Sequence, residues 1–205
     1  QLISLKNIFM TTIENNSNPT IILIGGAAGT SKTTNGNSIC NAFSINHRMG
    51  SGFMRESVKS FISKEVNPYL YNFSFSPHDN TPPFQNLYKQ SEPIKGPMEL
   101  CINRAFNEGT SLLIEGVNVI PGLINTNNVS LKCIFIVEDY DQHFQMITGK
   151  THFKRKITKE QFQNVRAIQE NFKIAANKHD WLIFDLSEEI DLIKKFEQKL
   201  KEKNL

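Results

Sequence analysis

The sequence has no long hydrophobic run, and none of its apolar segments approaches the roughly 20 residues that a helix needs to cross a membrane. We therefore expect no membrane partner. It also has few cysteines: Cys40, Cys101 and Cys133 are scattered and form no Cys-x-x-Cys pair. This pattern indicates small core residues in a reducing compartment, so we expect a cytoplasmic protein.

The chain lacks a strong charge of either sign and a metal-binding pattern of histidines. It has 23 Lys and Arg residues against 20 Asp and Glu residues, which gives a formal net charge of +3 at pH 7. A charge this small permits a phosphorylated ligand, but nucleic acid usually requires a strong basic stripe, so we do not expect nucleic acid as a partner. The five histidines are not spaced like metal ligands, and we expect structural or surface roles for them.

Four short apolar segments, rich in β-branched residues, predict buried strands at residues 20–26, 110–116, 131–137 and 181–186. The segments around them predict helices over 32–43, from about 53, over 97–108, from 158 and from 187. Strands that alternate with helices favour a mostly parallel sheet covered on both faces. The length of 205 residues suits one α/β domain over 19–205, preceded by an N-terminal extension over 1–18.

Three helix starts carry specific signals. Pro97 occupies the first position of one predicted helix, where a missing N–H costs nothing. Thr158 and Gln161 form a capping box at the start of another, and Ser187 is the predicted cap of the last. By contrast, the five prolines within 66–95 predict a long irregular segment, a type that is often functional.

The turn after the first strand matches the phosphate-loop consensus G-x-x-x-x-G-K-[ST] at every fixed position except Ser31. A strand before it and a helix after it are the required context, because the loop N–H groups and the helix N-terminus then converge on phosphate. Lys32 would reach the β- and γ-phosphates, and the Thr33 hydroxyl would bind Mg²⁺. Ser31 costs about 1 kcal/mol if it needs a positive φ. The predicted nucleotide-binding residues are Gly26, Ala27, Ala28, Gly29, Thr30, Ser31, Lys32, Thr33 and Thr34.

One acidic residue, Glu115, ends the second predicted strand. An ionised carboxylate inside an otherwise apolar strand would be costly without a partner. It should therefore lie at the carboxyl end of the strand, where open parallel sheets bind ligands. We predict that Glu115 holds Mg²⁺ together with Thr33 or orients the attacking hydroxyl, as acidic residues do in phosphate-loop enzymes.

Transfer of phosphate to a second anion needs several cations to offset the repulsion. Arg55 is one candidate, and a basic lid over about 148–158 is another, since a closing lid would also exclude water. The guanidinium of Arg155 suits phosphate best, so we predict a catalytic role for it. The cations of the predicted lid are Lys150, Lys154, Arg155 and Lys156.

Four segments, in this order and spacing, resemble the 2-phosphoglycerate kinase family of phosphate-loop kinases: "LIGGAAGTSKTT", "GSGFMRESVKSFI", "GTSLLIEGVNVIPG" and "NVRAIQENF". The resemblance extends over about residues 20–185. It implies a three-layer α/β/α sandwich of the nucleoside- and adenylate-kinase type with a short basic lid. It also implies ATP and Mg²⁺ as cofactors and transfer of the γ-phosphate to 2-phosphoglycerate, or to another small phosphorylated molecule in related branches.

The resemblance also implies roles for single residues. Arg55 matches an arginine placed for the acceptor's phosphate or carboxylate, and Arg166 matches an arginine near ATP. Asn118 stands where many relatives have histidine, and we predict that it contacts the substrate. Gly52 replaces an aspartate expected near the acceptor, which leaves the identity of the acceptor open.

Two alternatives remain at this stage. The first is a kinase of the same fold that acts on a nucleoside or on a nucleic-acid 5′-hydroxyl, although the small net charge argues against a long polyanion. The second is a protein that binds nucleotide without turnover, which the departures at Ser31 and Gly52 allow.

Overall fold

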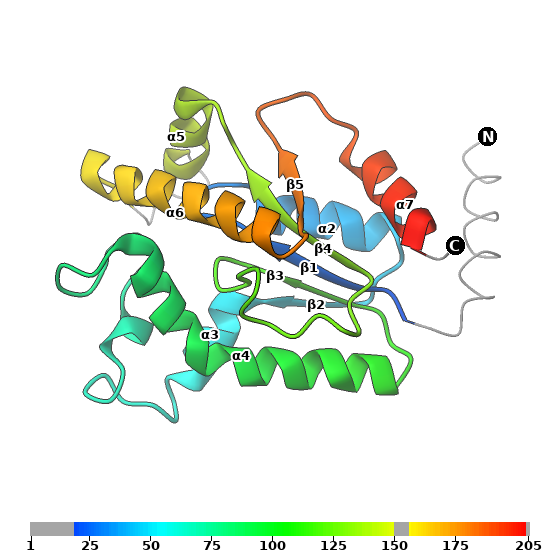
Figure 1. The fold of residues 1–205 in the computed structure, drawn as a ribbon, viewed down its shortest axis with the longest axis horizontal. Coiled ribbons are helices and arrows are strands. Elements are labelled where there is room, and N and C mark those ends of the chain that lie inside the picture. Colours follow the sequence, from blue (N-terminus) through cyan, green and yellow to red (C-terminus); the bar gives the residue numbers. More distant parts are fainter. Residues whose placement is uncertain (1–18, 150–155, 204–205) are drawn as a thin grey trace.

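The computed structural model describes residues 19–149 and 156–203, and a five-stranded sheet forms its centre (Figure 1). The strand order is β2-β3-β1-β4-β5, and every strand pair in this sheet is parallel. Every residue of β1 is buried, as expected for the central strand of a parallel sheet. The strands are β1 (Ile21–Gly25), β2 (His47–Gly50), β3 (Leu112–Glu115), β4 (Leu131–Ile136) and β5 (Leu182–Asp185). The predicted extension over 1–18 lies outside the described residues.

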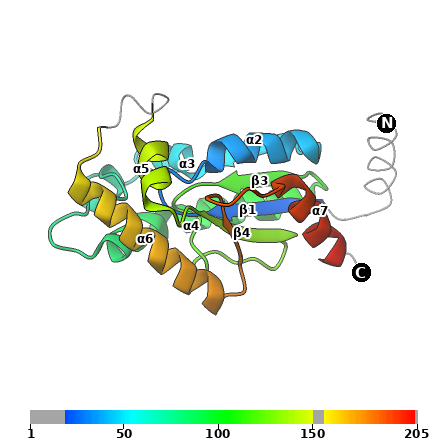
Figure 2. The same cartoon turned by 90° about the horizontal axis from the view of Figure 1, so that it is seen from above.

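Helices cover both faces of the sheet. On one face, α4 (Pro83–Asn107) and α6 (Lys159–Lys178) bury a cluster of apolar side chains against the strands. On the other, α2 (Lys32–Ala42) and α7 (Leu192–Lys203) bury a second cluster. Figure 2 shows α2 and α6 on opposite sides of the strands. The three-layer α/β/α sandwich predicted from the sequence is therefore confirmed.

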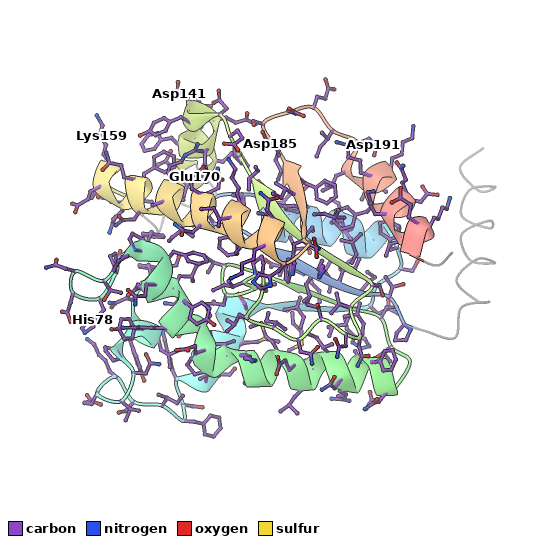
Figure 3. All side chains as sticks on the ribbon, viewed as in Figure 1. His78, Asp141, Lys159, Glu170, Asp185 and Asp191 are labelled. Atoms are coloured by element: carbon purple, nitrogen blue, oxygen red, sulfur yellow. The ribbon has the colours of Figure 1, made fainter. Side chains whose placement is uncertain are left out.

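The capping box predicted for α6 is present. Gln161 donates its backbone N–H to the Thr158 hydroxyl at 3.1 Å, and the Thr158 N–H donates to the Gln161 side chain at 3.0 Å. Helix α6 begins at Lys159 as a result (Figure 3), and Phe162, Val165 and Phe172 lie on its buried face. Local capping and helical periodicity agree here, so the sequence predicts both the start and the orientation of the helix.

Helix α4 differs from the prediction, because it begins at Pro83 and contains both Pro93 and Pro97. The predicted irregular segment over 66–95 is therefore wrong from Pro83 onward. A proline inside a helix removes a hydrogen bond and costs about 3 kcal/mol. Burial of Ile94 and Met98, both 0% exposed in the core beside these prolines, offsets that cost. Before Pro83, the segment contains one short 3₁₀ helix, η1 (Pro68–Tyr71).

One strand, one helix and the start of another helix have no clear signal in the sequence. Strand β2 is a polar edge strand whose first two residues are exposed, so it has no apolar run, and α3 (Ser51–Val58) follows it directly. Helix α5 (Tyr140–Thr148) is capped by Asp139, which accepts from the N–H of Gln142.

Helix α7 starts five residues later than predicted, at Leu192. Figure 3 shows Asp185 at the end of β5 and Asp191 at the start of α7. Ser187 hydrogen-bonds Asp185, whereas Asp191 accepts the N–H of Lys194 at 3.0 Å and caps the helix.

The prediction that the cysteines are core residues agrees with the fold for two of the three. Cys40 and Cys133 are buried, Cys101 is half-buried and all three are free thiols. No helix within the described ranges combines the length and the apolar character that crossing a membrane requires.

Because one face of α6 is buried, shortening one of its large core side chains should destabilise the protein. Phe172 is 0% exposed and packs edge-on against Phe84, with ring centroids 5.8 Å apart. Replacing Phe172 with Ala should lower the free energy of unfolding by about 3–5 kcal/mol, because it removes buried area and leaves a cavity.

Urea unfolding followed by circular dichroism measures this effect. Ile174→Ala is the matched control, since Ile174 lies on the same helix but is 66% exposed, and its effect should stay within about 0.5 kcal/mol. Equal losses in the two variants would contradict the packing described for α6.

Candidate nucleotide-binding site

The phosphate loop joins β1 to α2 at the carboxyl end of the sheet. Gly26 has φ +132°, and a Cβ there would lie 2.3 Å from the Phe135 carbonyl oxygen of β4. Gly29 has φ +80°, and a Cβ there would lie 2.7 Å from the Cβ of Ile147. The two glycines of the motif are therefore required by their backbone conformation and by the close approach of α5 and β4.

Ser31 adopts the left-handed conformation that the missing glycine would adopt. Its φ is 47° and its ψ is 26°, it is the N-cap residue of α2, and its side chain makes no capping hydrogen bond. Ser31 therefore adopts a conformation that is accessible to glycine without strain. A non-glycine residue in this region costs roughly 1–2 kcal/mol.

Lys32 folds back over the loop. Its ammonium group donates to the Thr30 hydroxyl at 3.1 Å and to the carbonyl of Ala27. The side chain is buried, so its charge is held close to the loop N–H groups and the N-terminus of α2. Together these groups form a positively polarised concavity of the kind that binds phosphate.

Glu115 lies next to this loop because β3 pairs with β1, with Glu115 opposite Ile24. The Thr33 hydroxyl donates to Glu115 Oε1 at 3.0 Å. The Arg48 guanidinium donates to the same oxygen, with Nη1 at 3.2 Å. The two residues predicted to bind Mg²⁺, Thr33 and Glu115, therefore lie in contact, and Arg48 is a third member of the group that the sequence did not indicate.

The oxygen atoms of Thr33 and Glu115 suit Mg²⁺, a hard cation that prefers hydroxyl, carboxylate and phosphate oxygens. Among the described residues, no group of three or more His, Cys, Asp or Glu side chains is placed to hold a metal. Within the described ranges, Thr33 and Glu115 would therefore supply only part of a metal's ligands. The set fits a Mg²⁺ ion whose remaining ligands are nucleotide phosphates and water.

A cavity of about 570 Å³ opens in front of the loop. Its lining includes residues 28–34 of the phosphate loop, Arg48 and Glu115. Residues 50–53 and 73–75 and Arg55 also line it. A Cβ on Gly52 would meet no atom within 4 Å, so the position of the missing aspartate is open space. The phosphate loop and Arg55 therefore border one shared cavity.

Arg55 reaches this cavity from α3. Its Nη1 donates to the Asn72 carbonyl at 3.3 Å, its Nη2 pairs with Glu56 at 3.1 Å, and its side chain is 16% exposed. Its Nε is buried and has no hydrogen-bond partner in the described part of the chain. The guanidinium is therefore oriented by the protein while retaining donor capacity.

Asn118 is buried in a polar network and is one of the residues that line the cavity. Its side-chain amide donates to Gln90 at 3.1 Å and to Ser91 at 2.9 Å, and its oxygen accepts from Ser51 at 3.3 Å. Gln90 in turn donates to the Asn72 carbonyl, the same acceptor that Arg55 uses. Asn118 is thus tied through this network to the backbone that orients Arg55.

Arg166 lies behind the loop and does not line the cavity. It donates to the Val137 carbonyl at 2.6 Å and lies 3.3 Å from Nδ1 of His143, whose Nε2 is 2.8 Å from the Ala28 carbonyl. Because Arg166 can only donate, Nδ1 accepts and Nε2–H donates to Ala28. Arg166 therefore contacts the phosphate loop through His143.

The predicted lid is described only in part. Lys150, Lys154 and Arg155 lie outside the described residues, and Lys156 is exposed in an irregular segment. Gln145 and Gly149, at the end of α5, line the cavity, so the chain enters the predicted lid beside it.

The backbone of Ser31 predicts the effect of restoring the consensus. Ser31→Gly should raise the free energy of unfolding by up to about 1 kcal/mol, because glycine adopts positive φ without strain but has a more flexible unfolded state. Chemical unfolding measures the change. Ser44→Gly is the matched control, since Ser44 is exposed outside the cavity and has φ 52°. A loss of stability in Ser31→Gly alone would contradict the conformation described.

Burial is the main cause that lowers the pKa of His143 to about 4; the hydrogen bond to the Ala28 carbonyl opposes this shift, and the nearby charges of Arg166 and Lys32 add to it. The folded state thus binds a proton less readily than the unfolded state, whose histidine pKa is about 6.5. The stability contributed by neutral His143 is complete above about pH 6.5 and is lost as pH falls toward 4. Between pH 7 and pH 5 the loss from this residue should be about 2 kcal/mol.

Denaturant unfolding of the wild type and of His143→Gln at both pH values tests this prediction. Glutamine can still donate to the Ala28 carbonyl but does not titrate. The variant should therefore lose about 2 kcal/mol less than the wild type between the two pH values. Parallel losses in both proteins would show that His143 does not stay neutral in the fold.

Comparison with known proteins supports the fold and the resemblance. No protein-family model matches the chain. The chain is 27% identical over 185 residues to the 2-phosphoglycerate kinase of Methanopyrus kandleri, which covers 82% of this chain and 56% of that protein. It is 28% identical over 182 residues to the 2-phosphoglycerate kinase of Methanothermobacter thermautotrophicus, covering 78% of this chain and 58% of that one. The chain therefore spans somewhat more than half the length of these curated relatives.

Among solved structures, shikimate kinase from Acinetobacter baumannii in complex with shikimate superposes with a TM-score of 0.54 at 12% identity, over 91% of this chain and 95% of that one. This likeness shows a shared fold. The chain is thus a sequence relative of the 2-phosphoglycerate kinases, as its motifs predict, built on the phosphate-loop kinase fold that shikimate kinase also has.

Proposed function

We propose that this protein is an ATP-dependent phosphotransferase that moves the γ-phosphate of ATP to a hydroxyl group of a small anionic acceptor. The observation that carries the proposal is the phosphate loop whose Thr33 hydroxyl meets Glu115 at 3.0 Å. We further propose that the acceptor is already phosphorylated. 2-Phosphoglycerate is the first candidate, because the curated relatives carry that name.

The loop side of the cavity would hold ATP. Backbone N–H groups of Gly26–Thr34 and the N-terminus of α2 would bind the phosphates, with Lys32 turning from the loop carbonyls to the β- and γ-phosphates. Thr33 and Glu115 would hold Mg²⁺, which supplies charge neutralisation at the transferring phosphoryl group when bound.

The opposite side would hold the acceptor. Arg55 would bind its phosphate or carboxylate through donors that the protein leaves available. Asn118 would hold the floor of this side in place through Ser51 and Gln90. The acceptor oxygen would bond to the γ-phosphorus as the bond to the ADP oxygen breaks, and the hydroxyl proton would leave to a nearby base. Phosphoryl transfer depends mainly on position and charge, so the absence of a carboxylate at Gly52 is compatible with it.

Two predicted roles complete this proposal. Arg155, from the lid, would neutralise charge on the transferring group. Arg166 would act on the nucleotide side by holding His143 against the Ala28 carbonyl.

The two alternatives differ from this proposal in measurable ways. A nucleoside kinase would accept uncharged acceptors, which give Arg55 no anion to bind, and a nucleic-acid 5′-hydroxyl kinase would bind RNA in a salt-sensitive way. A protein without turnover would bind ATP but release no ADP with any acceptor. The left-handed Ser31 favours neither alternative, because the loop keeps the course that a glycine would give it.

Replacing Lys32 with Ala tests the nucleotide site. The wild type should bind Mg·ATP, and Lys32→Ala should weaken binding by at least about tenfold, the effect of losing one charge-assisted hydrogen bond. Isothermal titration calorimetry measures the affinity. Lys199→Ala is the matched control, since Lys199 lies on the outer part of α7 and pairs with Glu202.

An ADP-release assay over small phosphorylated acceptors, including 2-phosphoglycerate, then tests the reaction. Acceptor-stimulated release that is lost in Lys32→Ala would support the kinase. Undiminished ATP binding with no stimulation by any acceptor would favour the binding protein, and the absence of ATP binding would overturn the proposal.

A further inference from the structure

We infer that Arg48 is a built-in cation of the nucleotide site, which pairs with Glu115 when no metal is present and turns to the phosphates when nucleotide binds. The inference rests on the proposed function, because it assumes that ATP occupies the loop. As a consequence, the affinity for ATP falls less on removal of Mg²⁺ than it would if Arg48 were absent.

The position of Arg48 follows from the sheet. Strand β2 pairs in parallel with β3, so that Arg48 lies opposite Leu113 and Gly50 opposite Glu115. The stem of Arg48 runs beside α2, where its Cδ would lie 3.9 Å from a Cβ on Gly36. The long side chain therefore places the guanidinium beside Glu115 at the carboxyl end of β3, and Arg48 lines the cavity.

The contact with Glu115 is an ion pair of two unequally exposed groups. The Glu115 side chain is 8% exposed and the Arg48 side chain is 31% exposed. A carboxylate this buried needs a cation or several donors, because an unpaired buried charge is costly. Arg48 supplies that cation while keeping an exposed side toward the cavity.

Arg48 and a metal ion would compete for one atom. Oε1 of Glu115 already accepts from Thr33 and from Arg48. A Mg²⁺ ion held by Thr33 and Glu115 would need the same carboxylate. A guanidinium at hydrogen-bond distance from that oxygen therefore opposes metal binding through both position and charge.

A nucleotide phosphate bound to the loop would offer the displaced guanidinium a second anion. Nη1–Oε1 is the one hydrogen bond that the Arg48 guanidinium makes among the described residues, and an arginine has five N–H donors. It lies next to Thr33, whose neighbours bind phosphate in loops of this kind. The planar fork of arginine matches phosphate oxygens, so the nucleotide itself offers Arg48 a better partner than a carboxylate oxygen shared with a hydroxyl.

Calorimetric titration with ATP in excess EDTA and in excess Mg²⁺ tests the inference, with Arg48→Gln as the variant. Metal-free ATP should bind Arg48→Gln at least about tenfold more weakly than the wild type, because one charge-assisted contact is lost. Mg·ATP should change by less than about threefold, since removal of Arg48 also frees Glu115 for the metal. Arg104→Gln is the matched control, because Arg104 is 77% exposed on α4 and should change neither affinity.

A second pair of variants keeps the test independent of any folding defect in Arg48→Gln. Glu115→Gln should tighten the binding of metal-free ATP, because it releases Arg48 and removes a negative charge, and adding Arg48→Gln should abolish most of that gain. Equal losses for Arg48→Gln with and without Mg²⁺, or a double variant equal to Glu115→Gln, would overturn the inference. No binding of ATP by the wild type in either condition would overturn the proposed function as well.

Discussion

The parallel pairing of β1 with β3 is the constraint on which the site depends. It places Glu115 opposite Ile24, so the acidic residue lies beside the phosphate loop that follows β1. The pairing of β2 with β3 then brings Arg48 to the same carboxylate. Residues separated by 67 and 82 positions along the chain thus meet at one oxygen atom. The register of these strands, which buried apolar side chains set, therefore determines which side chains meet at the carboxyl end of the sheet.

Charge neutralisation is the second theme of the structure. A site that brings ATP next to another anion must offset strong repulsion, and it does so most effectively with groups fixed in advance. In the proposed function, the loop N–H groups and Lys32 would provide this for the nucleotide. Arg55, held by the Asn72 carbonyl that Gln90 also contacts, would provide it for the acceptor. Through Gln90 and the Asn72 carbonyl, the buried polar network around Asn118 therefore helps to position Arg55.

The parts of the structure that the sequence predicts correctly are those with strong local signals. The buried strands read as apolar runs, and α6 has both a capping box and a helical stripe. The first half of helix α4 escapes prediction because its prolines are strong local stop signals, which burial of Ile94 and Met98 overrides, whereas the predicted helix over 97–108 matches its second half. Strand β2 and Arg48 were missed for a related reason, since an edge strand held by pairing with β3 needs no apolar run.

The central claim is that the loop after β1 binds the phosphates of ATP. The most direct measurement is a crystal structure with Mg²⁺ and a non-hydrolysable ATP analogue. We expect the β-phosphate to lie within hydrogen-bond distance of the backbone N–H groups around Lys32 and Thr33. We also expect the metal to lie between Thr33, Glu115 and the phosphates. A nucleotide bound elsewhere in the molecule, with the loop making no phosphate contact, would contradict it.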